Sequence, residues 1–268
     1  MGWSNGNHKS TGGTIIVEGL EHFEGLITRD IPLNNWYFRG EPDEYDIPFL
    51  AGIWRSGHDF TNRTEVAPNT GFTVGELEAV KRCQSDVVAG RLEDESFTDQ
   101  MHEVAAPIDL SSVDLLNWLS LAQHYNSDQI YPTRLIDITV EPLVALYFAV
   151  MKNSRRPGFV FAFKDGFNDL GTAGRVAEQG DTFLDVFRID GNDGLPYCPN
   201  DDTINLMRPP VENARSHAQK GLFVWNRGID CRLRPGWLIF QIPSEQKAPI
   251  MSLLAEKGID ENSLRLRD

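Results

Sequence analysis

The amino-acid sequence predicts an α+β fold in a single mixed domain. Apolar residues at helical spacing dominate the first half of the chain, whereas aromatic and β-branched runs typical of strands dominate the second half. No repeat, coiled coil or linker forces a division of the 268 residues. We therefore expect one domain over residues 13–268, with a helical N-terminal half. It follows a disordered tail over residues 1–12, which is rich in Gly, Asn and Ser.

The helices of the first half are predicted from spacing and from capping residues. Residues 20–27 and 74–88 have helical spacing, and Ser111 or Ser112 can cap a further helix that ends near Tyr125. The apolar residues of this third helix recur at i, i+3, i+4 and i+7, as on a buried face: Leu115, Trp118, Leu119 and Ala122.

In the second half, Thr139 is the expected N-cap of an almost wholly apolar helix over residues 143–151, with Pro142 in the first turn. Such a helix is expected to be central, because no face of it suits water. A last helix is expected over residues 248–257. Aromatic and β-branched content predicts strands at 36–38, 135–136, 159–163, 183–189, 222–225 and 237–242.

The composition is that of an ordinary globular protein, with 41% hydrophobic and 24% charged residues. No apolar run approaches the roughly 18–20 residues that span a bilayer, and the N-terminus lacks the apolar core of a secretory signal. Three scattered cysteines form no CxxC pair, which argues against a disulfide framework. We expect a cytoplasmic protein with no membrane partner.

The charge of the chain is acidic overall but unevenly distributed. A net charge of −14 argues against general affinity for nucleic acid, since phosphate contacts supply most non-specific binding. Residues 207–234, however, hold six basic and two acidic side chains, a net +4. Arg208 and Arg215 lie in this basic segment. The segment could contact a pyrophosphate or a nucleic-acid strand, or it could pair with the protein's own acids.

Common catalytic motifs are missing from the sequence. There is no G-x-S-x-G, no Walker phosphate loop and no Gly-rich dinucleotide turn, and the six histidines show no metal-ligand spacing. We predict no metal site. The remaining possibility is a site of Arg, His, Asp, Thr and Gln side chains that acts on an anionic or sugar-containing ligand.

Arg39 lies at the end of an aromatic strand and is followed by Gly40. Its planar guanidinium could hold a phosphate with two hydrogen bonds, or it could pair with Glu41. His124 and Tyr125 close a helix, where a histidine either packs or acts in catalysis.

Arg134 and Asp137 are three apart on a strand and should face opposite sides. One of the two could bind a ligand while the other makes a structural contact that fixes the adjoining loop. Alternatively, both could belong to structural ion pairs. Gln219, before the strand at 222–225, can offer both a donor and an acceptor.

Together these segments resemble the FRG domain family, named for the signature that is here Phe38-Arg39-Gly40. The resemblance continues through Gln123-His124-Tyr125, through residues 132–139 (PTRLIDIT) and through residues 142–149 (PLVALYFA). It resumes at Asn213-Ala214-Arg215, at residues 219–223 (QKGLF) and in the last helix. These landmarks span roughly residues 20–264.

The order of motifs is similar to that of the Arg-Ser-Glu class of ADP-ribosyltransferases. This resemblance implies a split β-sheet core in which Arg39 grips the pyrophosphate of NAD. Residues 137–139 would replace the Ser-Thr-Ser strand, and residues 219–221 would replace the turn that carries the catalytic Glu. Gly221 stands where that Glu is expected. Asp137 or Glu41 would then have to supply the acid.

The resemblance implies an NAD-dependent ADP-ribosyltransferase, a toxin or phage-defence effector that modifies RNA, DNA or protein, with NAD as co-substrate and an antitoxin protein as a companion. In this hypothesis Arg39 and Arg134 anchor the phosphates, with Thr139 in the same cofactor site, and His124 or Tyr125 orients the nicotinamide or ribose. Asp137 and Gln219 stabilise the ribose cation, while Arg208 and Arg215 contact the acceptor. The alternative is a non-catalytic nucleotide-sensing or interaction domain; a nuclease or other hydrolase has little support.

Overall fold

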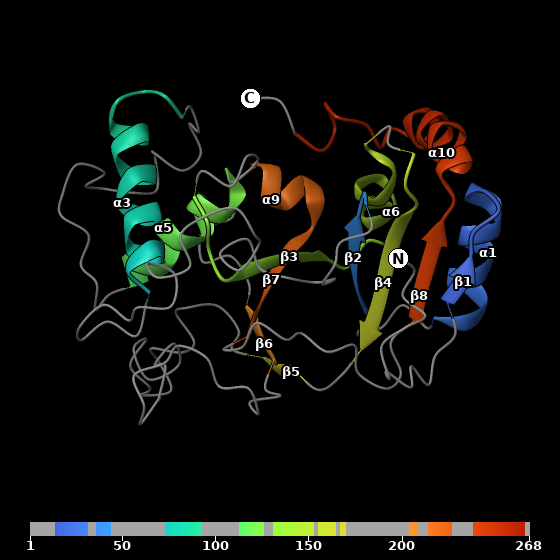
Figure 1. The fold of residues 1–268 in the computed structure, drawn as a ribbon, viewed down its shortest axis with the longest axis horizontal. Coiled ribbons are helices and arrows are strands. Elements are labelled where there is room, and N and C mark those ends of the chain that lie inside the picture. The colour runs from blue at the N-terminus through green and yellow to red at the C-terminus, as the bar shows by residue number, and fades with distance from the viewer. Residues whose placement is uncertain are drawn as a thin grey trace. The chain divides into compact units, whose positions relative to one another are not determined.

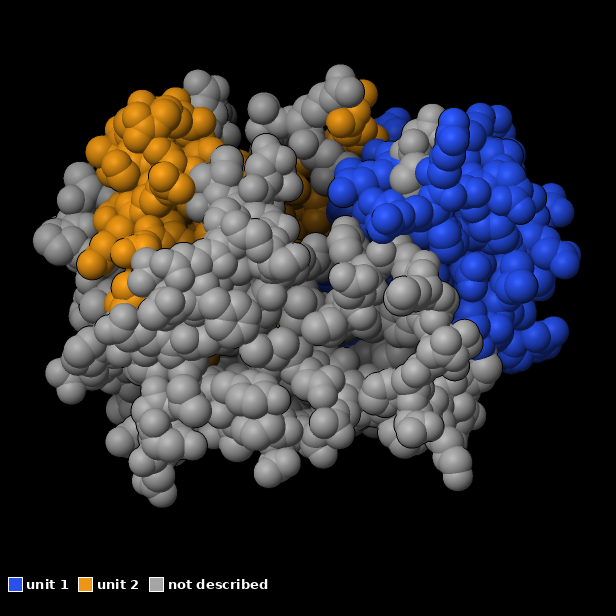
Figure 2. Space-filling model, in the orientation of Figure 1, with its two compact units in different colours: residues 1–46, 139–165, 232–260 blue, residues 47–138, 166–231, 261–268 orange. Residues whose placement is uncertain are grey.

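The computed structural model describes residues 14–31, 36–43, 73–92, 113–125, 131–152, 155–164, 167–169, 204–207, 214–226 and 238–265. The fold is α+β, as predicted. The chain divides into two compact units, drawn in different colours in Figure 2. Unit 1 consists of residues 1–46, 139–165 and 232–260, and unit 2 of residues 47–138, 166–231 and 261–268. No helix in the described part of the chain combines the length and apolar character needed to cross a membrane.

Unit 1 is built on a mixed sheet with the strand order β1-β8-β4-β2 (Figure 1). The two central strands, β8 (Leu238–Ile242) and β4 (Gly158–Lys164), run antiparallel to each other. At one side β1 (Thr14–Ile16) pairs parallel with β8, and at the other β2 (Trp36–Glu41) pairs antiparallel with β4 along its full length. This sheet joins segments from three separate parts of the chain.

The described residues of unit 1 include the helices α1 (Leu20–Asp30), α6 (Pro142–Val150) and α10 (Ser244–Glu256). Phe23 of α1 packs edge-to-face on Phe240 of β8, with ring centroids 5.3 Å apart. Helix α6 is buried on almost every side, which confirms the prediction of a central apolar helix.

The backbone of α6 lies directly on two glycines of the sheet. A Cβ atom added to Gly40 of β2 would lie 1.9 Å from the carbonyl oxygen of Ala145, and one added to Gly158 of β4 would lie 2.0 Å from that of Ala149. Ala145 and Ala149 are four apart, so they occupy one face of α6. The helix can lie this close to the sheet only because Gly40 and Gly158 have no side chain at the points of contact. This packing explains why a glycine follows Arg39.

Unit 2 contains the helices α3 (Val74–Val88), α5 (Val113–His124) and α9 (Ala214–Gln219). Thr73 and Glu76 form a reciprocal capping box at the start of α3, whose bounds agree with the predicted ones. The strands follow the order β3-β7-β6-β5. They are β3 (Leu135–Thr139), β7 (Gly221–Asn226), β6 (Ile204–Met207) and β5 (Phe167–Asp169); Thr139, the last residue of β3, belongs to unit 1.

Several sequence-based expectations change. Thr139 is the end of β3 and not a helix cap, because Glu141 is the N-cap of α6 and Pro142 is its first residue. Helix α10 begins at Ser244, earlier than predicted, and carries Pro249 inside it. The expected tail at 1–12, the caps Ser111 and Ser112 and the strand at 183–189 lie outside the described residues. The single domain over 13–268 stays a prediction.

The contact between α6 and β2 predicts the effect of Gly40→Ala. The added methyl group collides with backbone atoms of α6, which cannot move as a side chain can, so we expect a loss of about 3 kcal/mol or more in the free energy of unfolding. Gly25→Ala is the matched control, since Gly25 is exposed within α1 and has open space around its Cβ position. That variant should gain about 0.5–1 kcal/mol. Equal urea midpoints for Gly40→Ala and the wild type would contradict the packing argument.

Candidate functional site

Arg39 and Glu41 form an ion pair on one face of β2, in unit 1. The Nε atom of Arg39 donates to Oε1 of Glu41 at 2.9 Å, and the two side chains are 13% and 3% exposed. Residues two apart on a strand face the same side, which allows this contact. The pairing that the sequence left open for Arg39 is therefore confirmed. Its phosphate role stays a prediction.

Thr139 lies beside this pair in the register of the strands. Phe38, the neighbour of Arg39, is the antiparallel partner of Thr139. The Thr139 hydroxyl accepts a hydrogen bond from the backbone N–H of Glu141 at 3.0 Å, which shapes the turn into α6. Of the predicted site residues, the structure thus places Arg39 and Thr139 together in unit 1.

Arg134 is buried in unit 2 and bound to Glu76 of α3. Its Nε donates to Oε1 of Glu76 at 2.5 Å, its Nη2 donates to Oε2, and its backbone N–H reaches Oε1 at 3.3 Å. Arg134 is 2% exposed and Glu76 is 0% exposed. Because a buried charge needs a partner, this geometry favours the structural ion pair over phosphate binding for Arg134.

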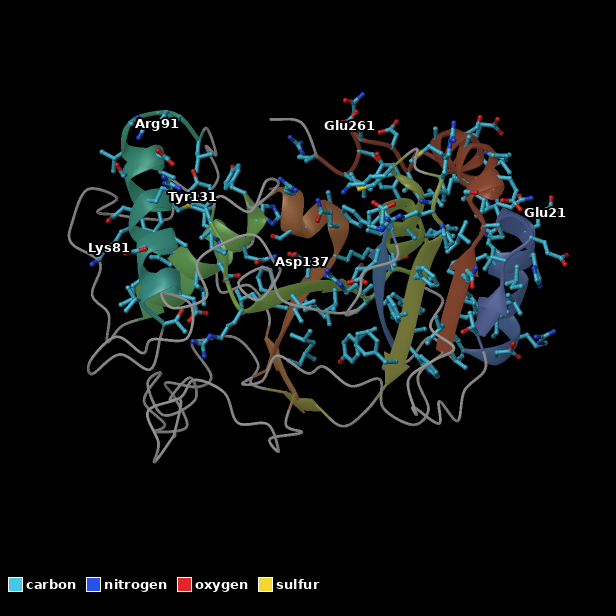
Figure 3. All side chains as sticks on the ribbon, in the orientation of Figure 1. Glu21, Lys81, Arg91, Tyr131, Asp137 and Glu261 are labelled. Carbon is cyan, nitrogen blue, oxygen red and sulfur yellow. The ribbon has the colours of Figure 1, made fainter. Side chains whose placement is uncertain are left out.

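Asp86, a second acid of α3, binds Tyr131 in the segment that precedes β3. The hydroxyl of Tyr131 donates to Oδ2 of Asp86 at 2.5 Å, and Nε of Arg91 donates to Oδ1 at 2.6 Å (Figure 3). The Tyr131 and Arg91 hydrogen bonds lower the pKa of Asp86, and burial together with Asp86 raises the pKa of Tyr131. Sequence reasoning missed both acids of α3, although the Thr73-x-x-Glu76 spacing was a usable sign of a cap.

Gln123 joins α5 to β3 through both ends of its amide. Its Nε2 donates to Oδ2 of Asp137 at 2.6 Å, and its Oε1 accepts from the Thr133 hydroxyl at 2.5 Å. Thr133 in turn accepts from the backbone N–H of Leu135 at 3.2 Å. Asp137 is exposed on β3, whereas buried Arg134 lies just before this strand, so the prediction that both residues lie on one strand is wrong. The Asp137 carboxylate is the one exposed acid of the predicted site.

His124 and Arg215 lie close enough in unit 2 to interact electrostatically. Burial, and then the Arg215 guanidinium, lower the pKa of His124 from 6.5 to about 3. Its Nε2 and the Nε of Arg215 are both buried without a hydrogen-bond partner. Tyr125 packs edge-to-face on the His124 ring, with centroids 6.1 Å apart. An imidazole with this pKa is neutral at pH 7 and is not a charged proton donor there.

The remaining predicted residues are on or near α9. Nε2 of Gln219 donates to the backbone oxygen of Leu264 at 3.0 Å, which ties α9 to the segment after α10. Gln219 is the last residue of α9 and Gly221 is the first residue of β7, so only Lys220 of the expected turn lies between the two elements. Arg208 lies outside the described residues. Within the described ranges, no group of three His, Cys, Asp or Glu side chains could hold a metal ion.

Lys247 was also missed by sequence reasoning. It is a 2% exposed lysine of α10 in unit 1, and its Nζ donates to the backbone oxygens of Pro42 at 2.5 Å and Lys152 at 3.5 Å. Burial lowers the pKa of this amine. Lys247 thus fixes the chain just beyond Glu41 and just beyond α6. The last helix was predicted to begin only at residue 248, so the sequence gave no sign of this role.

The Arg134–Glu76 pair predicts a non-additive effect on stability. Arg134→Met leaves the Glu76 carboxylate buried without its cation, so we expect a loss of about 3–5 kcal/mol. The double variant Arg134→Met, Glu76→Gln removes both charges and should lose clearly less than the sum of the single variants. Urea unfolding of the four proteins measures this coupling. Additive losses would show that the two side chains act independently.

The pKa of His124 predicts a pH effect with a definite sign. The folded protein protonates His124 only near pH 3, whereas the unfolded chain does so near 6.5. Between these values the unfolded state binds more protons, so the free energy of unfolding should fall as the pH is lowered from 6.5 to about 3. His124→Gln should reduce this slope. Equal slopes in wild type and His124→Gln would contradict the prediction.

Comparison with known proteins identifies one segment of the chain. The searches of curated proteins and of solved structures found no match to the chain. Residues 34–157 match the family model of the FRG domain, a range that includes the Arg39–Glu41 pair, α3, α5, β3 and α6. The chain therefore contains an FRG domain over residues 34–157.

Proposed function

We propose that this chain is an NAD-dependent ADP-ribosyltransferase that modifies a macromolecule as a toxin or phage-defence effector. One observation carries the proposal. Strand β2, which carries Arg39, pairs at Phe38 with Thr139, and the chain continues from Thr139 into α6. The Arg-Ser-Glu class of ADP-ribosyltransferases leads us to expect this arrangement, in which the strand that carries the arginine lies beside the strand that carries the Ser-Thr-Ser motif.

The proposed reaction is a substitution at the nicotinamide ribose. The bond between C1 of that ribose and the nicotinamide nitrogen breaks, and its electron pair leaves with neutral nicotinamide. A nitrogen or oxygen of the acceptor forms the new bond to C1 and loses its proton to a carboxylate or to water. The oxocarbenium-like transition state is stabilised by nearby negative charge. Arg39 would bind the NAD phosphates, and exposed Asp137 is the proposed acid, with Gln219 at the ribose.

The acceptor in this proposal is RNA, DNA or protein. Arg215 and Arg208, from the basic segment at 207–234, are the proposed contacts to an anionic acceptor. A toxin of this kind also requires an antitoxin partner in the cell that makes it. Arg134 is left out of the proposed NAD site because Glu76 occupies its guanidinium.

A second candidate function is nucleotide sensing without catalysis. Two observations favour it. Gly221 stands where a catalytic Glu is expected, and Glu41, one of the two candidate replacements, is 2% exposed and bound by Arg39. A sensing domain would bind NAD without releasing nicotinamide, so calorimetry combined with nicotinamide detection distinguishes the two functions.

The test is labelling with tagged NAD in bacterial lysate, with protein and nucleic-acid fractions examined separately. Wild type should label one fraction. Arg39→Lys keeps a cation beside Glu41 but loses the planar guanidinium, so it should fold normally and label at least about tenfold more slowly. Arg29→Lys, at an exposed position of α1, is the matched control and should label as wild type does.

The outcomes separate the candidates. Full labelling by Arg39→Lys would exclude the phosphate role of Arg39. NAD binding without label in either fraction and without free nicotinamide would replace the transferase by the sensing domain. Asp137→Asn tests the acid in the same assay, because Gln123 can still contact the amide while the negative charge is lost.

A further inference from the structure

Three buried polar atoms of unit 2 have no hydrogen-bond partner among the described residues: Oγ of Ser120, Nε2 of His124 and Nε of Arg215. A buried donor or acceptor without a partner costs about 1–3 kcal/mol, and most such groups in native proteins are satisfied. Three of them in one unit therefore require an explanation. An absent ligand that completes their hydrogen bonds is such an explanation.

The three groups come from two helices. Ser120 and His124 are four residues apart on α5, so their side chains lie on the same face of that helix. Ser120 is only 8% exposed. Arg215 is on α9, and its charge acts on the His124 ring. This electrostatic interaction relates Arg215 of α9 to the face of α5 that carries Ser120 and His124.

The chemistry of these groups selects the ligand. The Arg215 Nε–H can only donate a hydrogen bond, the Ser120 hydroxyl can donate one, and the imidazole donates from Nε2 in its protonated form or in one neutral tautomer. The positive charge of the Arg215 guanidinium also attracts an anion. Three donors with one fixed positive charge suit an oxyanion better than a cation or an apolar group.

We propose that Ser120, His124 and Arg215 form a binding site for a phosphate group. The phosphate oxygens would accept from all three side chains and would balance the charge of Arg215. The site assigns buried Ser120 and His124 to the same ligand as Arg215, which was proposed above as an acceptor contact. It goes beyond the transferase function and does not depend on catalysis, since a sensing domain could use it equally. It also gives His124 a binding role in place of the predicted catalytic one.

The experiment titrates the full chain with inorganic phosphate, ADP-ribose and adenosine while the imidazole NMR signals of His124 are followed. Phosphate and ADP-ribose should shift these signals, and adenosine, which has no phosphate, should not. A bound anion should also move the pKa of His124 upward, because it offsets the charge of Arg215. A response to ADP-ribose alone would identify a nucleotide phosphate, and a response to both would identify any phosphate.

Two variants and a control complete the test. Arg215→Met should weaken phosphate binding at least about tenfold, as expected for the loss of a charge-assisted hydrogen bond, and Ser120→Ala about threefold. Lys81→Met removes the same charge from an exposed position of α3 (Figure 3) and should leave binding unchanged. The proposal is overturned if neither phosphate nor ADP-ribose shifts the His124 signals. It is also overturned if Arg215→Met binds as tightly as Lys81→Met.

Discussion

The direct contact between the backbone of α6 and the glycines of the sheet is the constraint on which the rest of unit 1 depends. Gly40 and Gly158 leave no room for a side chain, and Ala145 and Ala149 complete the contact from the helix. A helix held this close fixes the end of β2, where Arg39 and Glu41 lie, and the turn at Thr139 that leads into α6. The glycine after Arg39 is therefore a packing requirement. The arginine before it is held by that packing in a defined place.

In unit 2, side-chain hydrogen bonds connect β3 and the residues just before it to helices α3 and α5. Glu76 and Asp86 of α3 bind Arg134 and Tyr131, and Gln123 of α5 binds Thr133 and Asp137. The segment before β3 is thus connected to both helices by hydrogen bonds rather than by apolar packing alone. Such a network is sensitive to the loss of a buried member, because its partners are then left without their hydrogen bonds; Glu76, Thr133 and Arg134 are the buried polar members. Asp137 is the member that also faces solvent.

The sequence predicted local features well and long-range partners poorly. The bounds of α3 and the burial of α6 follow from periodicity and apolar content, which a sequence displays directly. Arg134 was placed wrongly on the strand that carries Asp137, because β3 begins only at Leu135. The partner of Arg134 is 58 residues away, and the partners of Lys247 are 95 and 205 residues away. No local pattern specifies such pairs. Glu41 was foreseen as the partner of Arg39 because the two are neighbours on one strand. Thr139 was misjudged as a cap because a strand end and a helix start follow each other within three residues.

The order of strands in unit 1 has a consequence for synthesis on the ribosome. Strand β1 is made first, yet its sheet partner β8 comes more than 200 residues later, and Lys247 joins Pro42 across 205 positions. At roughly 5–20 residues per second, the first strand waits on the order of tens of seconds for its partner. A nascent chain that stops before α10 lacks Lys247, and one that stops before residue 238 lacks β8 as well. The arrangement around Arg39 is therefore completed only at a late stage of translation.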